Sequence, residues 1–310
     1  MAEPENILEV RHLCRHFSTG RGRSRTTVKA VDDVSFCVRK AETFGLVGES
    51  GCGKTTTGRT IIRLYDPSSG EILFDGREIS GKMTPEKRRY LTDNIAMIFQ
   101  DPIESLNPRM TIEEIVGEGL KLRGVSDKRE RHRRVVEMLN KVGLTEEHAA
   151  RYPHEFSGGQ RQRIGIARAL IVEPDFIIAD EPISALDMSI RAQVLNLLRH
   201  LQQQRGITYL FIAHDLSVMR YISDRIAVIH KGDIVELADA EELIAHPIHP
   251  YTRSLLSAIP MPSPRRERGK KLLIYDPSIH HYDTDPPAWR QLRDRHWVLC
   301  NEAEAADWMK

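Results

Sequence analysis

The sequence predicts an α/β fold in which helices cover both faces of a mainly parallel sheet. First, short apolar strands such as DFIIAD (175–180) and ITYLFIAH (207–214) alternate with segments of helical periodicity. Second, a glycine-rich loop stands between an apolar strand over 43–47 and a helix over 55–65. Third, only helical patterns occur from about 110 to 170, which indicates an inserted helical subdomain.

Composition places the chain among soluble globular proteins. It has 310 residues, of which 40% are hydrophobic and 29% charged, and its net charge of +1 gives no global attraction to nucleic acid or lipid. The four cysteines lack CxxC spacing and fit a reduced, cytosolic protein. No signal peptide pattern opens the chain, and no apolar window approaches about eighteen residues, so we expect no membrane crossing.

Near its two ends the chain shows weaker patterns of secondary structure. Residues 7–17 alternate loosely and predict an edge strand, and the basic stretch 20–29 reads as a solvated hairpin loop. Near the other end, the Pro- and Arg-rich segment 261–271 is interpreted as a linker, and the tail that follows it shows no clear element.

The loop 48–55 matches the phosphate-binding pattern G-x-x-x-x-G-K-[ST] and lies between strand and helix, as that pattern requires. Its backbone N–H groups would face phosphate oxygens, Lys54 would reach the β- and γ-phosphates, and Thr55 would bind Mg²⁺. We do not expect Cys52 to be a catalytic thiol. The predicted nucleotide-binding residues here are Gly48, Glu49, Ser50, Gly51, Cys52, Gly53, Lys54, Thr55 and Thr56.

Polar side chains close three apolar strands. Asp180 and Glu181 end FIIADE, where Asp180 would contact Mg²⁺, usually through water, and Glu181 would polarise the attacking water. His214 ends the next strand, at the same sheet edge, and is expected to contact the γ-phosphate. Gln100 ends NIAMIFQ, which places its amide to contact Mg²⁺ or water.

A second glycine-rich helix start, FSGGQ, follows the helical region. This helix N-terminus is a second possible anion-binding site, but one nucleotide hardly needs two such helix N-termini from one chain. Ser157 and Gly159 are therefore expected to serve a nucleotide held by another subunit, so that hydrolysis requires a dimer. The predicted residues are Ser157, Gly158, Gly159 and Gln160.

Together these segments resemble the ATP-binding subunit of an ABC transporter over roughly residues 6–260. GESGCGKTT resembles the Walker A loop, FIIADE the Walker B strand and FSGGQ the LSGGQ signature, while Gln100 and His214 match the Q-loop and H-switch. Ser184 and Asp187 fall in the D-loop, and Phe17 falls where the family has an adenine-stacking aromatic residue. The resemblance implies an ABC ATPase fold with an antiparallel β subdomain, a helical subdomain over about 102–170 and a C-terminal extension over 261–310.

A narrower resemblance concerns cargo. QDPIESLNPRMT (100–111), HPIHPYTRSLLSAIP (246–260) and the tail are similar to segments of the oligopeptide/dipeptide/nickel group of importers. It implies ATP and Mg²⁺ as cofactors, and uptake of oligopeptides or dipeptides, with nickel or another small solute as alternatives. Some members carry a cysteine cluster for iron–sulfur binding. This tail has only Cys300, so no cluster is expected, and His280, His281 and Asp283 are interpreted as a solvated tail.

The same resemblance implies the assembly. We expect a heterodimer with a related ATP-binding subunit, docked on two membrane-spanning permeases at the cytoplasmic face of the membrane, with an extracytoplasmic binding protein acting indirectly. Two other classes fit less well. A soluble ABC ATPase would carry coiled coils, zinc insertions or two ATPase halves. A P-loop kinase or GTPase would leave FSGGQ and His214 unexplained, and the chain has no N-K-x-D segment.

Overall fold

The computed structural model describes residues 5–19, 26–101, 105–184, 186–259 and 271–309, and these form two compact units. The first unit holds the residues up to Ile7, then Arg39–Glu42 and Lys82–Leu210. The second unit holds Leu8–Val38, Thr43–Gly81 and the residues from Phe211 onward. The sequence predicts different boundaries, with one domain over 6–260 and an extension over 261–310. The division into compact units does not test these boundaries, so they stay a prediction. The linker predicted over 261–271 lies almost wholly outside the described residues.

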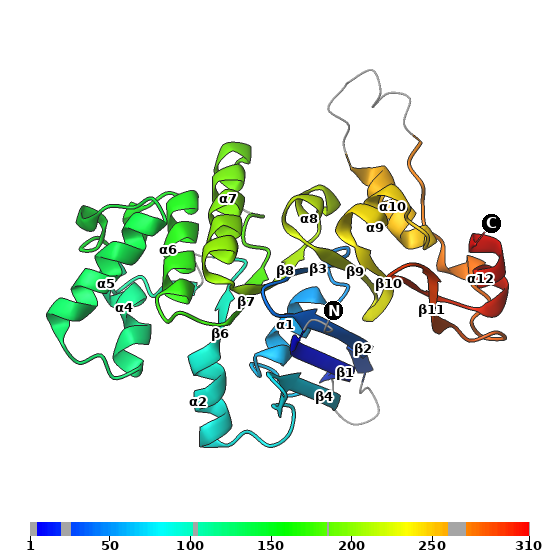
Figure 1. Cartoon of the computed structure of the whole chain (residues 1–310), viewed down its shortest axis with the longest axis horizontal. Helices are drawn as coiled ribbons and strands as arrows, with labels where there is room; N and C mark the ends of the chain where they lie inside the picture. Colours follow the sequence, from blue (N-terminus) through cyan, green and yellow to red (C-terminus); the bar gives the residue numbers. More distant parts are fainter. Residues whose placement is uncertain (1–4, 20–25, 102–104, 185, 260–270, 310) are drawn as a thin grey trace. The chain divides into compact units, whose positions relative to one another are not determined.

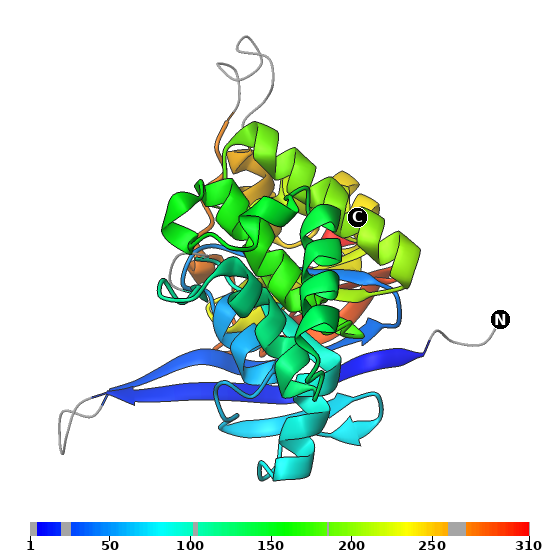
Figure 2. The ribbon, with the colours of Figure 1, turned by 90° about the vertical axis from the view of Figure 1, so that its left-hand side faces the viewer.

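The first unit is mainly helical. Helices α4, α5 and α6 pack against one another (Figures 1 and 2) through apolar residues at helical spacing, which include Ile115, Val135 and Ile164. A capping box of Thr111 and Glu114 starts α4. The helices are α2 (Pro85–Asn94), α4 (Ile112–Leu122), α5 (Lys128–Lys141), α6 (Gly158–Leu170) and α7 (Met188–Arg205), with 3₁₀ turns η2 (Glu146–His148) and η3 (Pro153–Glu155).

Two parallel strands of the first unit carry predicted site residues at their ends. Strand β6 (Ile95–Ile98) pairs with β7 (Phe176–Asp180), with Ile98 opposite Ala179. Every residue of β7 is buried, as its unbroken apolar sequence predicts for a strand of a parallel sheet. The residues that follow β6 and β7 therefore emerge at the same edge. Strand β8 (Thr208–Ala213) runs from this unit into the second one.

The second unit contains a small sheet in the order β2-β1-β4-β5, in which β1 pairs with β4 in antiparallel fashion. The prediction of an edge strand over 7–17 is wrong, because β1 has a neighbour on each side and buries Leu8, Val10 and Leu13. The stretch predicted as a hairpin loop, 20–29, is described only from residue 26, where β2 begins. The strands are β1 (Asn6–Thr19), β2 (Thr26–Arg39), β4 (Ser69–Phe74) and β5 (Arg77–Glu78).

The second unit also holds strands of a larger sheet, in the order β11-β12-β10-β9-β3. Strand β3 pairs with β9 in parallel, and β9, β10, β12 and β11 pair in antiparallel fashion in that sequence. The glycine-rich loop joins β3 to α1. The elements are β3 (Thr43–Val47), α1 (Lys54–Ile61), α8 (Leu216–Ile222), β9 (Arg225–His230), β10 (Asp233–Asp239), α9 (Ala240–Ala245) and α10 (Pro250–Ala258).

The C-terminal tail is ordered into elements that the sequence did not reveal. It forms η4 (Pro277–Ile279), β11 (Ala288–Arg293), β12 (His296–Cys300) and α12 (Glu302–Trp308). A fully buried carboxylate anchors it: Glu236 on β10 accepts from His296 Nε2 at 2.7 Å and from the Ile248 N–H at 2.8 Å. No helix in the described part of the chain is both long and apolar enough to cross a bilayer.

The tail also corrects the interpretation of its histidines. His280 is buried, bonds Glu304 and stacks on Tyr282 with ring centroids 4.7 Å apart, so this residue is not part of a solvated segment. His281 and Asp283 are exposed. The absence of an iron–sulfur cluster stays a prediction.

Candidate functional site

The glycine-rich loop of the second unit approaches neighbouring backbone so closely at two points that only glycine fits there. Gly53 has φ of 108°, and a Cβ there would lie 2.2 Å from the Ala30 carbonyl oxygen. A Cβ on Gly48 would lie 2.2 Å from the Ile229 carbonyl oxygen. The glycines of the pattern therefore let the loop pack against its neighbours while it turns into α1.

The start of α1 suits a phosphate group. Gly53 is its N-cap and provides no side-chain hydrogen bond, so the first-turn N–H groups of α1 are not capped by it and can point at phosphate oxygens. Lys54 is buried, and its Nζ donates to the carbonyls of Gly48 at 2.8 Å and Glu49 at 2.7 Å. The ammonium group thus lies within the loop, and Thr55 and Thr56 are half-buried on the same first turn. These donors fit a nucleotide phosphate.

Cys52 lies in the loop without the character of a nucleophile. It is buried, and this burial raises the pKa of its thiol. At neutral pH the thiol is protonated, which supports the expectation that it is not catalytic.

Two more predicted residues belong to the second unit. His214 is exposed directly after β8. Phe17 on β1 is half-buried, its ring meets Tyr65 edge-to-face at 5.5 Å, and the Arg15 guanidinium lies 4.5 Å from its centroid. Phe17 therefore sits in a cation–π contact, and the structure leaves its adenine-stacking role a prediction.

In the first unit, three predicted residues meet at the ends of β6 and β7. Asp180 is fully buried as the last residue of β7, and Glu181 follows with a left-handed backbone, φ 44°. Gln100 Nε2 donates to Glu181 Oε2 at 3.2 Å, and Ser184 Oγ donates to the Glu181 carbonyl at 3.1 Å. A strained backbone that positions a carboxylate is typical of functional sites.

The signature segment forms the start of α6. Ser157 is the N-cap, and its reciprocal bonds with Gln160 form a capping box: Ser157 N–H donates to Gln160 Oε1 at 3.1 Å, and Gln160 N–H donates to Ser157 Oγ at 3.4 Å. Gly159 allows a close approach to α7, because a Cβ there would lie 2.9 Å from Ile190 Cγ2. Ser157 and Gly158 are exposed.

The signature and the D-loop line one hollow of about 510 Å³. Asp187 caps α7 by accepting from Ile190 N–H at 3.0 Å, and this bond is the main cause that lowers the pKa of Asp187. Arg191, one turn later, donates to the Leu186 carbonyl at 2.7 Å and holds the D-loop backbone, a role that the sequence did not indicate. The hollow is lined by Gly143, Leu144, Ser157, Gly158, Gly159, Gln160, Arg163, Leu186, Asp187 and Ile190.

The predicted residues therefore gather in separate groups. The second unit carries the phosphate loop, Phe17 and His214. The first carries the Gln100–Glu181 pair, Asp180 and the signature with its D-loop.

A residue that sequence reasoning missed touches the phosphate loop. Tyr251 on α10 is fully buried, and its hydroxyl accepts a hydrogen bond from the Glu49 N–H at 3.0 Å. His230 packs on its ring with centroids 4.2 Å apart, and Tyr275 of the tail packs at 5.4 Å. The HPY segment 249–251 gives no sign of this contact in the sequence, because the contact joins residues 202 positions apart.

Tyr251→Phe is expected to weaken ATP binding about 2- to 10-fold. The change removes the acceptor for the Glu49 N–H, a hydrogen bond of about 0.5–1.5 kcal/mol, and leaves the loop less well held. Equilibrium titration with a fluorescent ATP analogue measures the effect. Tyr275→Phe is the matched control, because it removes the same hydroxyl from the adjacent ring and leaves the Glu49 bond in place. Equal losses in both variants would contradict a specific role for Tyr251.

Family models match two parts of the chain. The model described as "ABC transporter" matches residues 31–184, and the model described as "Oligopeptide/dipeptide transporter, C-terminal region" matches residues 235–284. The second match covers Tyr251 and most of β10, including Glu236, which anchors the tail.

Curated relatives match along nearly the whole chain. The oligopeptide transport ATP-binding protein OppF of Bacillus subtilis (strain 168) is 58% identical, over 97% of this chain and 98% of the relative. AmiF of Streptococcus pneumoniae, also named an oligopeptide transport ATP-binding protein, is 56% identical over 99% and 98%. The dipeptide transport ATP-binding protein DppF of Lactococcus lactis is 51% identical over 100% and 99%.

Solved structures match the fold. A dimeric, post-hydrolysis structure of the ATP-binding cassette MJ0796 with ADP and Pi has a TM-score of 0.69 and 29% identity, and covers 75% of this chain and 98% of that one. CbiO1 of Clostridium perfringens, part of an ABC transporter complex, has a TM-score of 0.67 and 27% identity, covering 78% and 91%. The fold is thus that of an ABC-type ATPase, which confirms the predicted fold class. The chain belongs to the ABC transporter family, in the group of oligopeptide/dipeptide transport ATP-binding proteins. Its ABC ATPase domain binds ATP.

Proposed function

We propose that this chain hydrolyses ATP to power the uptake of oligopeptides or dipeptides, as one of two different ATP-binding subunits below a pair of membrane-spanning permeases. An extracytoplasmic binding protein delivers the cargo, and the chain works at the cytoplasmic face of the membrane. The names of the relatives and the C-terminal family model support the cargo class.

The observation that carries the mechanism is the pair of glycine-bearing helix starts. Helix α1 has no side-chain cap and holds a lysine within its loop, whereas α6 has a capping box and opens on the hollow that it shares with the D-loop. The first suits the phosphates of the chain's own nucleotide. The second, with exposed Ser157 and Gly158, suits a nucleotide held by the partner subunit.

The chemistry follows from the groups present. Thr55, Asp180 and Gln100 would hold Mg²⁺ through the oxygen atoms that this ion prefers, and the bound ion would neutralise charge on the phosphates. Glu181, held by Gln100 at 3.2 Å, orients and polarises the attacking water. His214 contacts the γ-phosphate, and Phe17 stacks on adenine. Closure of the two subunits around ATP and their separation after hydrolysis drive the permeases.

The test is reconstitution of the whole transporter from its native membrane into liposomes. We expect two different ATPase chains in the purified complex, and ATP-dependent accumulation of a radiolabelled oligopeptide when binding protein is present outside. Accumulation of nickel in place of peptides would overturn the cargo, and a single ATPase species would overturn the heterodimer.

Ser157→Arg in this chain is expected to lower ATP hydrolysis by the assembled transporter at least about 10-fold, while ATP binding to the isolated chain is kept. The long side chain would occupy the hollow beside Asp187 and remove the cap of α6, at a cost of about 0.5–2 kcal/mol of stability. Steady-state phosphate release measures hydrolysis. Ser126→Arg, at an exposed position of the same unit, is the control. Normal hydrolysis in S157R would show that the signature does not contribute to the reaction.

A further inference from the structure

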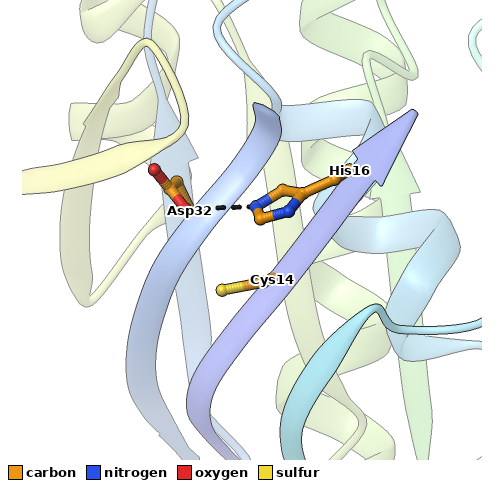
Figure 3. A group of neighbouring side chains, drawn as sticks. All are labelled: Cys14, His16 and Asp32. Atoms are coloured by element: carbon orange, nitrogen blue, oxygen red, sulfur yellow. Dashed lines mark hydrogen bonds and ion pairs between the residues drawn. The ribbon is translucent and has the colours of Figure 1, made fainter. Parts of the chain in front are cut away.

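Cys14 and His16 on β1 and Asp32 on β2 gather in the second unit (Figure 3). Their ligand atoms all lie within 4.8 Å of one another. Cys14 and His16 are two residues apart on one strand and so share a face, and β2 is the neighbour of β1 in the sheet. Among the residues that the structure describes, these three are the only His, Cys, Asp or Glu side chains that gather in this way. The ATPase chemistry proposed above uses none of them.

The spacing is close to what a tetrahedral metal ion needs. Zinc bonds of about 2.0–2.3 Å place neighbouring ligand atoms about 3.3–3.7 Å apart. His16 Nε2 and Asp32 Oδ1 are 3.1 Å apart, and Cys14 Sγ lies no more than 4.8 Å from either. Adjustments of about 1 Å by half-buried side chains would therefore complete the geometry.

Neighbouring groups already orient two of the three donors. The Asp33 N–H donates to Cys14 Sγ at 3.2 Å, and Lys29 Nζ donates to Asp32 Oδ2 at 2.9 Å, which leaves Oδ1 directed at His16. Outer partners of this kind hold metal ligands in place.

The local charge favours a cation. Burial, and after it repulsion from Asp32 and Asp33, raises the pKa of Asp233 to about 6, while Lys29 acts in the opposite direction. A divalent ion at Asp32 would offset this repulsion.

We propose that Cys14, His16 and Asp32 form a binding site for Zn²⁺, with water in the fourth position. A thiolate, an imidazole and a carboxylate suit zinc, whereas Mg²⁺ and Ca²⁺ select oxygen ligands. Binding releases the thiol proton of Cys14 to solvent, and His16 binds zinc through Nε2 as the neutral tautomer that carries its ring proton on Nδ1.

The test is titration of the full chain, purified with chelator and then freed of it, with Zn²⁺ against a chromophoric indicator and with Co²⁺ as a spectroscopic probe. We expect one site with a Kd of about 1 µM or lower. Bound Co²⁺ should show a thiolate charge-transfer band in the near ultraviolet. Cys14→Ser should abolish the band, and Cys14→Ser and His16→Gln should each weaken Zn²⁺ binding about 10- to 100-fold.

Matched controls come from the same two strands. Cys37→Ser removes another half-buried free thiol, on β2, and His12→Gln removes an exposed imidazole on β1 that pairs with Asp33. Both should bind Zn²⁺ as the parent does. The proposal is overturned if the parent binds no Zn²⁺ tighter than about 100 µM, or if the controls lose as much affinity as C14S and H16Q. If C14S does not fold, as judged by circular dichroism, the Zn²⁺ affinity of H16Q decides whether the proposal stands.

Discussion

Glu181→Gln is expected to reduce ATP hydrolysis by the assembled transporter about 10²- to 10⁴-fold and to leave ATP binding intact. Glutamine keeps the shape of the side chain and an oxygen that can accept from Gln100, but it cannot take a proton from water. Positioned acid–base groups contribute about this much to rate. Phosphate release under saturating ATP measures the loss, and a fluorescent nucleotide analogue measures binding.

Glu173→Gln is a matched control for this change. Glu173 is also an acidic residue that follows a buried segment of the first unit, and its backbone has nearly the same left-handed conformation, with φ of 49° against 44° for Glu181. Its carboxylate is exposed and faces Arg205 at 3.6 Å. Full activity in E173Q with loss in E181Q would assign the effect to the Glu181 carboxylate itself. Full activity in both would show that another group activates the water.

Lys54→Met is expected to weaken ATP binding about 10- to 100-fold, with loss of hydrolysis. Methionine resembles lysine in length but lacks the ammonium group that donates to the Gly48 and Glu49 carbonyls and would reach the phosphates. A charge-assisted hydrogen bond to a phosphate contributes about 1.5–3 kcal/mol, and each 1.4 kcal/mol is a factor of about 10 in affinity.

Binding of the fluorescent ATP analogue to the isolated chain measures this loss directly, without the partner subunits. Lys82→Met, at an exposed position, is the control for the loss of one positive charge. An unchanged affinity in K54M, with the melting temperature retained, would mean that the glycine-rich loop is not the site of the triphosphate.

The sequence predicted those parts of the molecule in which a local pattern and a local constraint agree. The buried strand 176–180, the helix after FSGGQ and the strand–loop–helix of the phosphate loop were found because apolar runs, glycines and capping residues fix them locally. The Gln100–Glu181 contact also follows from sequence, because parallel strands bring their carboxyl ends to one edge.

The missed features depend on contacts between distant segments. His296 on β12 forms a hydrogen bond with the buried Glu236, which lies 60 positions away in the sequence. No pattern within the tail predicts this contact. The same applies to the hydrogen bond between Tyr251 and Glu49, and to β1, whose loose alternation suggested an edge although β2 and β4 flank it.

The added hairpin of the tail also determines which strand ends the sheet of the second unit. Strand β10, with the apolar residues Ile234 and Val235, is covered by β12, and the outermost position passes to β11. That strand carries Arg290 and Arg293 and directly follows two prolines, features that discourage a further strand from adding. The tail therefore prevents β10 from being an exposed edge strand that could pair with other chains. Loss of the tail would favour aggregation of this subunit before it reaches its partners.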